Sequence, residues 1–177
     1  MKDKNEIRQY IRKEKRQRSS DELLLQSEKI MSLLEMHERF QKAHVVLAFY
    51  ALPDEPATQL RLETWAKHKQ ILLPVVDGDI LLLREYKDEH SLREGAFHIL
   101  EPQGAVFKDF SSIDLVIVPG VAFDGKCHRL GRGKGYYDKL LCHPDFQDVY
   151  KLGICFDFQK IDCVPTDAND IAMDEIL

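Results

Sequence analysis

The sequence predicts an α/β fold with a mostly parallel central sheet. Two observations carry this prediction: helical and strand-like patterns alternate along the 177 residues, and the strand-like segments are near-continuous apolar runs. Alternation favours a parallel sheet, because parallel strands are usually joined by a crossover helix. Near-continuous apolar runs are typical of strands that are covered on both faces. With 44% hydrophobic and 31% charged residues, the composition is that of an ordinary folded protein.

Two helices are predicted at the start of the chain. Residues 4–18 place Ile7 and Ile11 on one side of a helix. Four basic residues fall on another side at steps of three and four: Lys4, Arg8, Arg12 and Lys15. Ser19 followed by Glu22 fits a capping box, so a second helix is expected to begin near residue 21.

A strand, a helix and a hairpin are predicted next. The apolar run HVVLAFYAL, residues 44–52, is expected to be a buried strand that ends at the turn-like PDEP. Residues 58–69 form an amphipathic helical pattern, and residues 70–76 another apolar strand. The sequence DGD at 77–79 predicts a hairpin turn into a strand at 80–86.

The second half of the chain predicts fewer helices. Residues 92–104 are polar and punctuated by Gly and Pro, so a surface loop with one short extended piece is expected. Residues 111–120 and 150–156 are apolar strands, and a helix is expected over 136–141. The last stretch, 163–177, is expected to be a loop with a terminal strand. Without repeats or linkers, residues 1–177 are expected to form a single domain.

The totals argue against several classes of function. A net charge of −5 disfavours generic nucleic-acid binding, which usually comes with a basic surplus. No apolar run reaches the roughly 20 residues of a membrane span, and the charged first residues do not resemble a signal peptide. The four cysteines show no C-x-x-C pair and no zinc spacing. Reduced thiols in a cytoplasmic protein are therefore expected.

The segment RLGRGKGYYDKLL, residues 129–141, predicts a phosphate-binding site. Its alternate glycines, Gly131, Gly133 and Gly135, let backbone N–H groups approach an anion closely. Arg129, Arg132 and Lys134 supply cations for phosphate oxygens. Asp138, on the first turn of the following helix, is a carboxylate for a magnesium ion that bridges phosphates. The alternative is a flexible, solvated loop.

The segment is neither a P-loop nor a dinucleotide-binding fingerprint. A P-loop requires Ser or Thr after its lysine, whereas Gly135 follows Lys134 here. The third glycine also lacks the spacing of the dinucleotide motif, and no strand ending in Asp or Glu follows. The residue types predict phosphate binding. The rest of the chain has to indicate which molecule binds beside the phosphate.

Over essentially its full length the chain resembles the 5-formyltetrahydrofolate cyclo-ligase family, also called 5,10-methenyltetrahydrofolate synthetases. The resemblance rests on KNEIR in the first helix, the E-x-x-T of Glu55–Thr58, ILEP at 99–102, PGVAFD…RLGRGKGYYD, and the closing MDEIL. The glycine-rich block is the most specific of these motifs. The resemblance implies a three-layer α/β/α sandwich related to CoA transferases and ribose-5-phosphate isomerase.

The resemblance also implies a reaction in one-carbon metabolism. ATP and Mg²⁺ would support closure of 5-formyltetrahydrofolate to 5,10-methenyltetrahydrofolate, with release of ADP and phosphate. Transfer of the γ-phosphoryl group activates the formyl oxygen, and N10 then attacks the activated carbon. Alignment and charge neutralisation would dominate such a reaction. The expected partners are these small molecules, without nucleic acid or membrane, and the expected protein is a cytoplasmic monomer.

The resemblance assigns roles to particular residues. Lys4 and Arg8 would contact ATP from the first helix. Residues 129–137 would cradle the phosphates: Arg129, Leu130, Gly131, Arg132, Gly133, Lys134, Gly135, Tyr136 and Tyr137. Within them, Arg132 to Tyr136 would also border the folate, together with Tyr50 and Glu55. Lys134 and Arg132 are the candidate catalytic residues, with Lys134 stabilising the transferred charge. Asp138 and Asp174 would hold magnesium.

One departure and two alternatives accompany the resemblance. Many relatives carry a glycine where this chain has Cys127, so the turn there is expected to differ. A nucleic-acid-binding protein would use the basic helix and the glycine-rich loop, and would show a steep salt dependence. An ATP-binding relative that acts on a different acceptor would keep Lys134 and Asp138. ATP hydrolysis with and without folate separates that relative from a cyclo-ligase.

Overall fold

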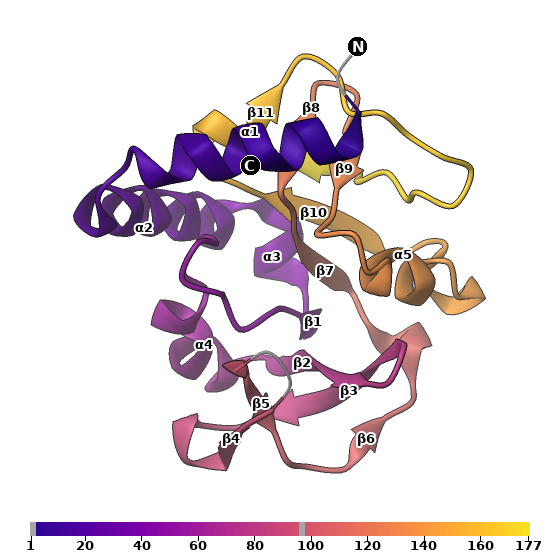
Figure 1. Cartoon of the computed structure of the whole chain (residues 1–177). Coiled ribbons are helices and arrows are strands. Elements are labelled where there is room, and N and C mark those ends of the chain that lie inside the picture. The colour runs from indigo at the N-terminus through magenta and orange to yellow at the C-terminus, as the bar shows by residue number, and fades with distance from the viewer. Residues whose placement is uncertain (1–2, 96–97) are drawn as a thin grey trace.

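The computed structural model describes residues 3–95 and 98–177. Within them, a seven-stranded sheet has the order β12-β10-β7-β1-β2-β3-β6 (Figure 1). Its strands are β1 (Val45–Leu47), β2 (Gln70–Asp77), β3 (Ile80–Tyr86), β6 (Val106–Phe107), β7 (Leu115–Pro119), β10 (Tyr150–Ile154) and β12 (Glu175–Ile176). The pairs β12/β10, β10/β7, β7/β1 and β1/β2 are parallel, whereas β2/β3 and β3/β6 are antiparallel. The predicted mostly parallel sheet is confirmed.

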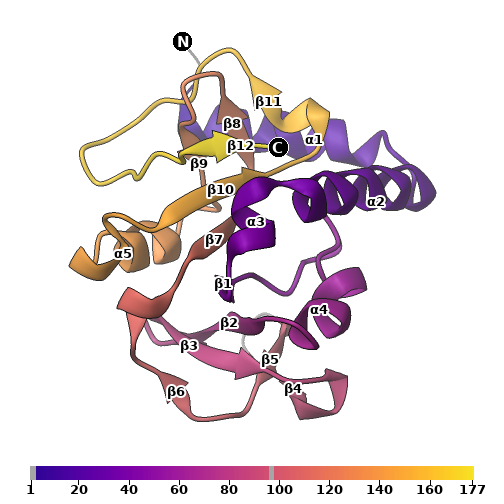
Figure 2. The same ribbon diagram turned by 180° about the vertical axis from the view of Figure 1, so that it is seen from behind.

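Helices cover both faces of this sheet (Figures 1 and 2). They are α2 (Ser20–Met36), α3 (Glu38–Lys42) and α4 (Gln59–Ala66) on one face, and α5 (Tyr136–Leu141) on the other. Neighbouring residues of a strand point to opposite faces: Val46 of β1 lies in the cluster that contains Trp65 of α4, and Leu47 lies in the cluster that contains Leu140 of α5. This double coverage explains the continuous apolar runs and confirms the three-layer α/β/α sandwich.

The first helix, α1 (Lys4–Arg16), packs outside these layers on a small sheet. That sheet has the order β11-β8-β9, with β8 (Ala122–Asp124), β9 (Arg129–Leu130) and β11 (Lys160–Ile161). Asp3 and Glu6 form a capping box that begins α1. The buried side chains of Ile7 and Ile11 then contact the small sheet. As a result, the basic side of α1 lies close to the glycine-rich segment that follows β9.

The loop between the first strand and α4 corrects one sequence prediction. The apolar run 44–52 predicted a long strand, but β1 ends at Leu47. Past the strand, the hydroxyl of Thr58 donates a hydrogen bond to the carbonyl oxygen of Phe49, which folds the chain back on itself. Ala48, Phe49 and Ala51 are buried although they lie outside the strand, so hydrophobicity alone overstates the length of the strand.

Residues 92–104 form more regular structure than predicted. Instead of a single extended piece, β4 (Leu92–Glu94) and β5 (Leu100–Pro102) pair as an antiparallel hairpin. Residues 96 and 97 of the predicted loop lie outside the described residues. Short 3₁₀ helices complete the chain: η1 (Glu89–Ser91), η3 (Phe110–Ser112), η4 (Pro144–Phe146) and η5 (Asp157–Gln159). Among the described helices, none combines the length and the apolar character that a membrane crossing requires.

Candidate functional site

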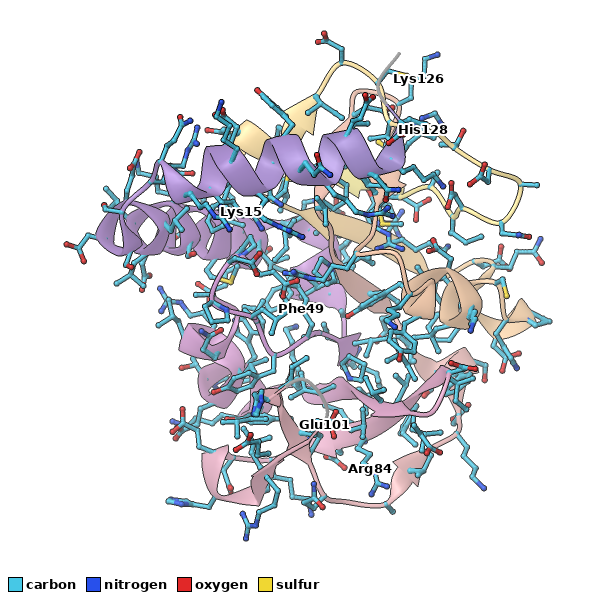
Figure 3. All side chains as sticks on the ribbon, viewed as in Figure 1. Lys15, Phe49, Arg84, Glu101, Lys126 and His128 are labelled. Atoms are coloured by element: carbon cyan, nitrogen blue, oxygen red, sulfur yellow. The ribbon has the colours of Figure 1, made fainter. Side chains whose placement is uncertain are left out.

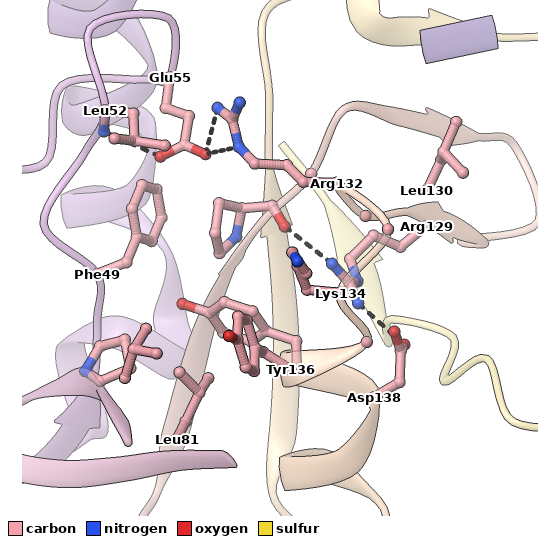
Figure 4. A pocket seen from close by; sticks show the side chains of 18 of the residues that line it. Phe49, Leu52, Glu55, Leu81, Arg129, Leu130, Arg132, Lys134, Tyr136 and Asp138 are labelled. Carbon is pink, nitrogen blue, oxygen red and sulfur yellow. Dashed lines mark hydrogen bonds and ion pairs between the residues drawn. The ribbon is translucent and has the colours of Figure 1, made fainter. Parts of the chain in front are cut away.

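A cavity of about 630 Å³ opens at the carboxyl ends of β1 and β7. These strands are neighbours in the sheet, and the chain progresses outward from them in opposite directions, to β2 on one side and to β10 on the other. Such a reversal of strand order is where α/β sheets usually bind ligands. The walls are the loop after β1, parts of β2, β3 and β5, and the glycine-rich segment after β9 (Figure 4).

Most of the residues predicted to bind ligands line this cavity. They are Arg8, Tyr50, Glu55, Arg129, Leu130, Gly131, Arg132, Gly133, Lys134, Gly135, Tyr136, Tyr137 and Asp138. Two predicted residues, Lys4 and Asp174, are not part of the lining. The structure therefore brings the glycine-rich segment, the two residues predicted to border the folate, and Arg8 of α1 around the same space.

The glycine-rich segment needs its glycines for backbone conformation and for space. Gly133 has a φ of 104° and Gly135 a φ of 68°, both in the left-handed region that other residues rarely adopt. A Cβ on Gly131 would lie 3.0 Å from Nη1 of Arg129. The bare backbone thus lets arginines pack directly against the segment and leaves its peptide groups accessible from the cavity.

A buried ion pair supports the floor of the site. Nη2 of Arg129 lies 2.9 Å from Oδ1 of Asp138, and Nη1 donates to the carbonyl oxygen of Pro119 at 3.3 Å (Figure 4). The Arg129 side chain is 4% exposed and that of Asp138 is 19% exposed. Since a buried arginine is costly without a carboxylate partner, Asp138 balances the charge of Arg129. The pair joins the strand β9 to the helix α5.

A second ion-pair cluster bridges the two walls of the cavity. Arg132 donates from Nε and Nη2 to Oε1 of Glu55, at 3.1 and 2.8 Å (Figure 4). Its Nη2 also donates to Oδ1 of Asp54 at 2.6 Å. The other oxygen of Glu55 accepts the backbone N–H of Leu52. Lys15 reaches Asp54 from α1 at 3.0 Å. Burial raises the pKa of Asp54, but the hydrogen bond from Arg132 and the charge of Lys15 outweigh burial and lower it.

Helix α1 contributes two further basic residues. Nε of Arg8 donates to the carbonyl oxygen of Gly131 at 3.0 Å, which anchors the glycine-rich segment. Lys4 lies 2.7 Å from Asp167 and 2.5 Å from Asp170, the second of which lines the cavity. Partial burial lowers the pKa of Lys4, but the hydrogen bonds to both aspartates outweigh it, so the pKa is raised. Lys4 therefore borders the site through Asp170.

Lys134 differs from the arginines around it. Its side chain lines the cavity, yet within residues 3–95 and 98–177 it takes part in no ion pair or hydrogen bond. Arg129 and Arg132 are both neutralised by carboxylates. Among the described residues, Lys134 is thus the cation of the glycine-rich segment that has no carboxylate partner. It can bind an incoming anion without first breaking an ion pair.

Three tyrosines border the same space. The hydroxyl of Tyr136 donates to the carbonyl oxygen of Gly78 at 3.2 Å, which ties α5 to the β2–β3 turn. The hydroxyl of Tyr137 is buried and has no hydrogen-bond partner among the described residues. Burial raises the pKa of Tyr137 and of Tyr50. A buried hydroxyl without a partner beside a cavity is a group that a ligand can satisfy.

The structure does not gather the two predicted magnesium ligands at one point of the cavity. Asp174 is exposed, and its Oδ2 accepts the backbone N–H of Lys151 at 2.7 Å, which holds β12 beside β10. Within the described residues, no group of three or more His, Cys, Asp and Glu could hold a metal ion. Magnesium bound with a nucleotide needs only one or two carboxylates beside the phosphates. Of the two predicted ligands, Asp138 lines the cavity, and its Oδ1 is already paired with Arg129. The pair of Asp138 and Asp174 stays a prediction.

Several cavity residues were missed by sequence reasoning. Phe49, Glu101 and Asp170 line the cavity, although none was predicted to bind a ligand. Glu101 lies within the ILEP motif, so its residue type was visible but its position was not. Cys127 adopts a φ of 62°, a glycine-like conformation at the position where many relatives were expected to carry glycine. The turn therefore adopts a left-handed conformation at a residue that carries a side chain; its expected difference from the relatives stays a prediction.

Comparisons with known proteins match the chain over nearly its whole length. The sequence profile of the 5-formyltetrahydrofolate cyclo-ligase family matches residues 1–177. A 5-formyltetrahydrofolate cyclo-ligase of Haemophilus influenzae is 27% identical over 181 residues and covers 96% of each chain. The protein of that name from Mus musculus is 29% identical, over 98% of this chain and 94% of its own. The structure of Aquifex aeolicus 5,10-methenyltetrahydrofolate synthetase has a TM-score of 0.86 at 33% identity, over 98% of this chain and 88% of that one.

Proposed function

The chain belongs to the 5-formyltetrahydrofolate cyclo-ligase family, and on that premise we propose that this ligase uses Mg²⁺ and ATP to close 5-formyltetrahydrofolate to 5,10-methenyltetrahydrofolate. The observation that carries the proposal is the cavity itself. Its glycine-rich segment presents the uncommitted cation Lys134 opposite walls that include Tyr50, Pro74 and Val76. One space therefore offers contacts both for phosphate and for a flat organic ring.

The reaction needs the formyl oxygen to be converted into a leaving group. The γ-phosphoryl group moves from ATP to that oxygen, and ADP departs. N10 then attacks the formyl carbon, its proton is lost, and the oxygen leaves as phosphate. Because the phosphoryl oxygens carry the developing charge, positioned cations and a closed geometry account for most of the catalysis.

Different residues in and around the glycine-rich segment contribute to these steps. Lys134 meets the transferred phosphoryl group, and the peptide N–H groups of the segment contact the other phosphates. Arg8 holds the segment through the carbonyl oxygen of Gly131. Mg²⁺ that arrives with ATP would neutralise phosphate charge, and Asp138, with Asp174 as the second predicted ligand, would hold it. Arg132 keeps its contacts with Glu55 and gives up its contact with Asp54 when an anion competes for it.

The folate is expected to lie against the opposite wall. Tyr50 and Phe49 from the loop after β1, and Pro74 from β2, offer apolar surfaces for the ring. Glu55 is buried and fixes the position of Arg132 at the junction of the two ligands. We also propose that the protein is a cytoplasmic monomer that acts on small molecules and binds neither nucleic acid nor membrane.

The test follows the absorbance band of methenyltetrahydrofolate in purified protein. The band should rise only when 5-formyltetrahydrofolate, ATP and Mg²⁺ are all present. In Lys134→Ala, loss of a cation at the transferred group should lower turnover by about 10²–10³-fold. Lys139→Ala is the matched control, since Lys139 lies on α5 and donates to the carbonyl oxygen of Asp79 outside the cavity lining.

The outcomes separate the candidate acceptors. A rise in wild type and in Lys139→Ala, together with a collapse in Lys134→Ala that still binds ATP, supports the proposal. Folded protein that binds ATP but gives no rise would refute cyclo-ligase chemistry and indicate an ATP-dependent enzyme with a different acceptor. Isothermal titration with ATP distinguishes that case from a protein that binds no nucleotide.

A further inference from the structure

Glu101 is a buried carboxylate in the cavity wall that the proposed chemistry leaves unused. It lies on β5 and is 6% exposed. Its Oε1 accepts the backbone N–H of Val76 at 3.2 Å. A carboxylate can accept about four hydrogen bonds and is costly to bury without partners. The position therefore favours a ligand that brings hydrogen-bond donors.

Glu101 also differs from the other carboxylates of the cavity. Glu55 is paired with Arg132, Asp138 with Arg129, and Asp170 with Lys4. Of the carboxylates that line the cavity, only Glu101 has no cationic partner among the described residues. It is thus the carboxylate whose charge and acceptor sites remain available to a ligand.

The surroundings of Glu101 favour a flat ring. Pro74 and Val76 of β2, Leu81 of β3, and Ile99 beside β5 line the same cavity. Figure 3 shows Glu101 on the side of β2 and β5, while Lys15 lies on the side of α1. The cations that line the cavity belong to α1 and to the glycine-rich segment, whereas Glu101 belongs to β5. One part of the cavity thus suits anions, and another suits an apolar ring whose edge carries N–H donors.

The backbone near Glu101 leaves room for its carboxylate. A Cβ on Gly95 would lie only 1.9 Å from Oε2 of Glu101. The N–H of Gly95 donates to the carbonyl oxygen of Ile99 at 2.8 Å, which closes the hairpin. A side chain at position 95 would displace the carboxylate, so the observed position of the Glu101 carboxylate depends on glycine at position 95.

We infer that Glu101 binds the N3–H and 2-amino donors of the pterin ring. This inference rests on the proposed function, which supplies the pterin. A planar pair of adjacent N–H donors matches a carboxylate in the way that a guanidinium does. Glu55, which the family resemblance placed beside the folate, already accepts from Arg132 and from Leu52. Glu55 then positions Arg132, and Glu101 sets the orientation of the ring and the preference for a 2-aminopterin.

The first test measures the binding of 5-formyltetrahydrofolate to Glu101→Gln by isothermal titration calorimetry. The amide keeps the shape of the side chain and an acceptor for the N–H of Val76, but it turns a donor toward the donors of the pterin. Loss of hydrogen bonds to a charged acceptor should raise the Kd by about 10- to 100-fold. The Kd for ATP should stay within about twofold of wild type. Glu94→Gln, an exposed residue of the neighbouring strand β4, is the control and should match wild type.

The second test uses 2-desamino-5-formyltetrahydrofolate, which lacks the amino donor. Wild type should bind this analogue more weakly than the parent, whereas Glu101→Gln should discriminate little between the two. Equal discrimination by both proteins, or wild-type affinity in Glu101→Gln, would overturn the inference. If Glu101→Gln does not fold, failure of wild type to distinguish the two ligands overturns it as well. Wild type that binds neither folate refutes the proposed function first and this inference with it.

Discussion

Replacement of Asp138 by Asn should destabilise the protein by removing the charge that balances Arg129. The Arg129 side chain is 4% exposed, and its Nη2 lies 2.9 Å from Asp138. Removing one partner of a buried pair costs about 3–5 kcal/mol. Since Asp138 is 19% exposed, water screens part of the remaining charge, and we expect the lower end, about 3 kcal/mol. For a protein of this size, that corresponds to a fall in Tm of roughly 6–12 °C.

The assay is thermal and urea unfolding of wild type, Asp138→Asn, Arg129→Met and the double variant. Because the double variant has no buried charge at this site, its cost should fall below the sum of the two single costs by about 2 kcal/mol or more. The control is Glu38→Gln, whose pair with Lys42 is 74% exposed at both side chains and should leave the Tm unchanged. A fall of less than about 2 °C for Asp138→Asn would show that Arg129 does not depend on this carboxylate.

Three further predictions concern the frame around the site. Gly153→Ala should cost about 1–3 kcal/mol, because the new Cβ would lie 2.7 Å from the buried ring of Phe123; an unchanged urea midpoint contradicts it. Cys127→Val should lower the Tm more than Cys127→Gly, because a β-branched residue is strained at a φ of 62°; equal values would refute this reasoning. Burial raises the pKa of Asp170, but the hydrogen bond from Lys4 outweighs it and holds the pKa below the usual 3.8. The stability from this pair is therefore present above pH 3.8 and is lost as the pH falls through the lowered pKa of Asp170. Below that pKa, the urea midpoints of wild type and Lys4→Met should become equal.

Local patterns account for the parts of the fold that were predicted well. The helix over 136–141 and the strand over 80–86 were predicted with the observed bounds, because apolar periodicity and a Gly turn mark them. Gly78, with a φ of 57°, occupies the turn that DGD predicted. The capping box at Ser19 was confirmed in part: its Oγ accepts the N–H of Glu22, and α2 begins at residue 20.

The parts that were missed depend on contacts between distant segments. The strands β8, β9 and β11 have two or three residues each, too few for a periodic signal, and α1 packs over them. The glycine-rich segment was recognised because its residues are adjacent in sequence. Glu101 and Asp170 reach the cavity through a hairpin and a long loop, so their positions could not be read from neighbouring residues. The single domain over residues 1–177 stays a prediction.

The docking of α1 has a consequence for the order in which the protein folds. Arg8 and Gly131 are 123 residues apart in sequence, and Lys4 and Asp170 are 166 residues apart. Contacts that close such long loops form late, because the chain entropy is lost before the contacts stabilise it. The hairpin of β2 and β3 and the pairing of β1 with β2 close much shorter loops. We therefore expect a refolding chain to regain its secondary structure before it regains affinity for ATP. The delay between the two should be set by the rate at which α1 docks.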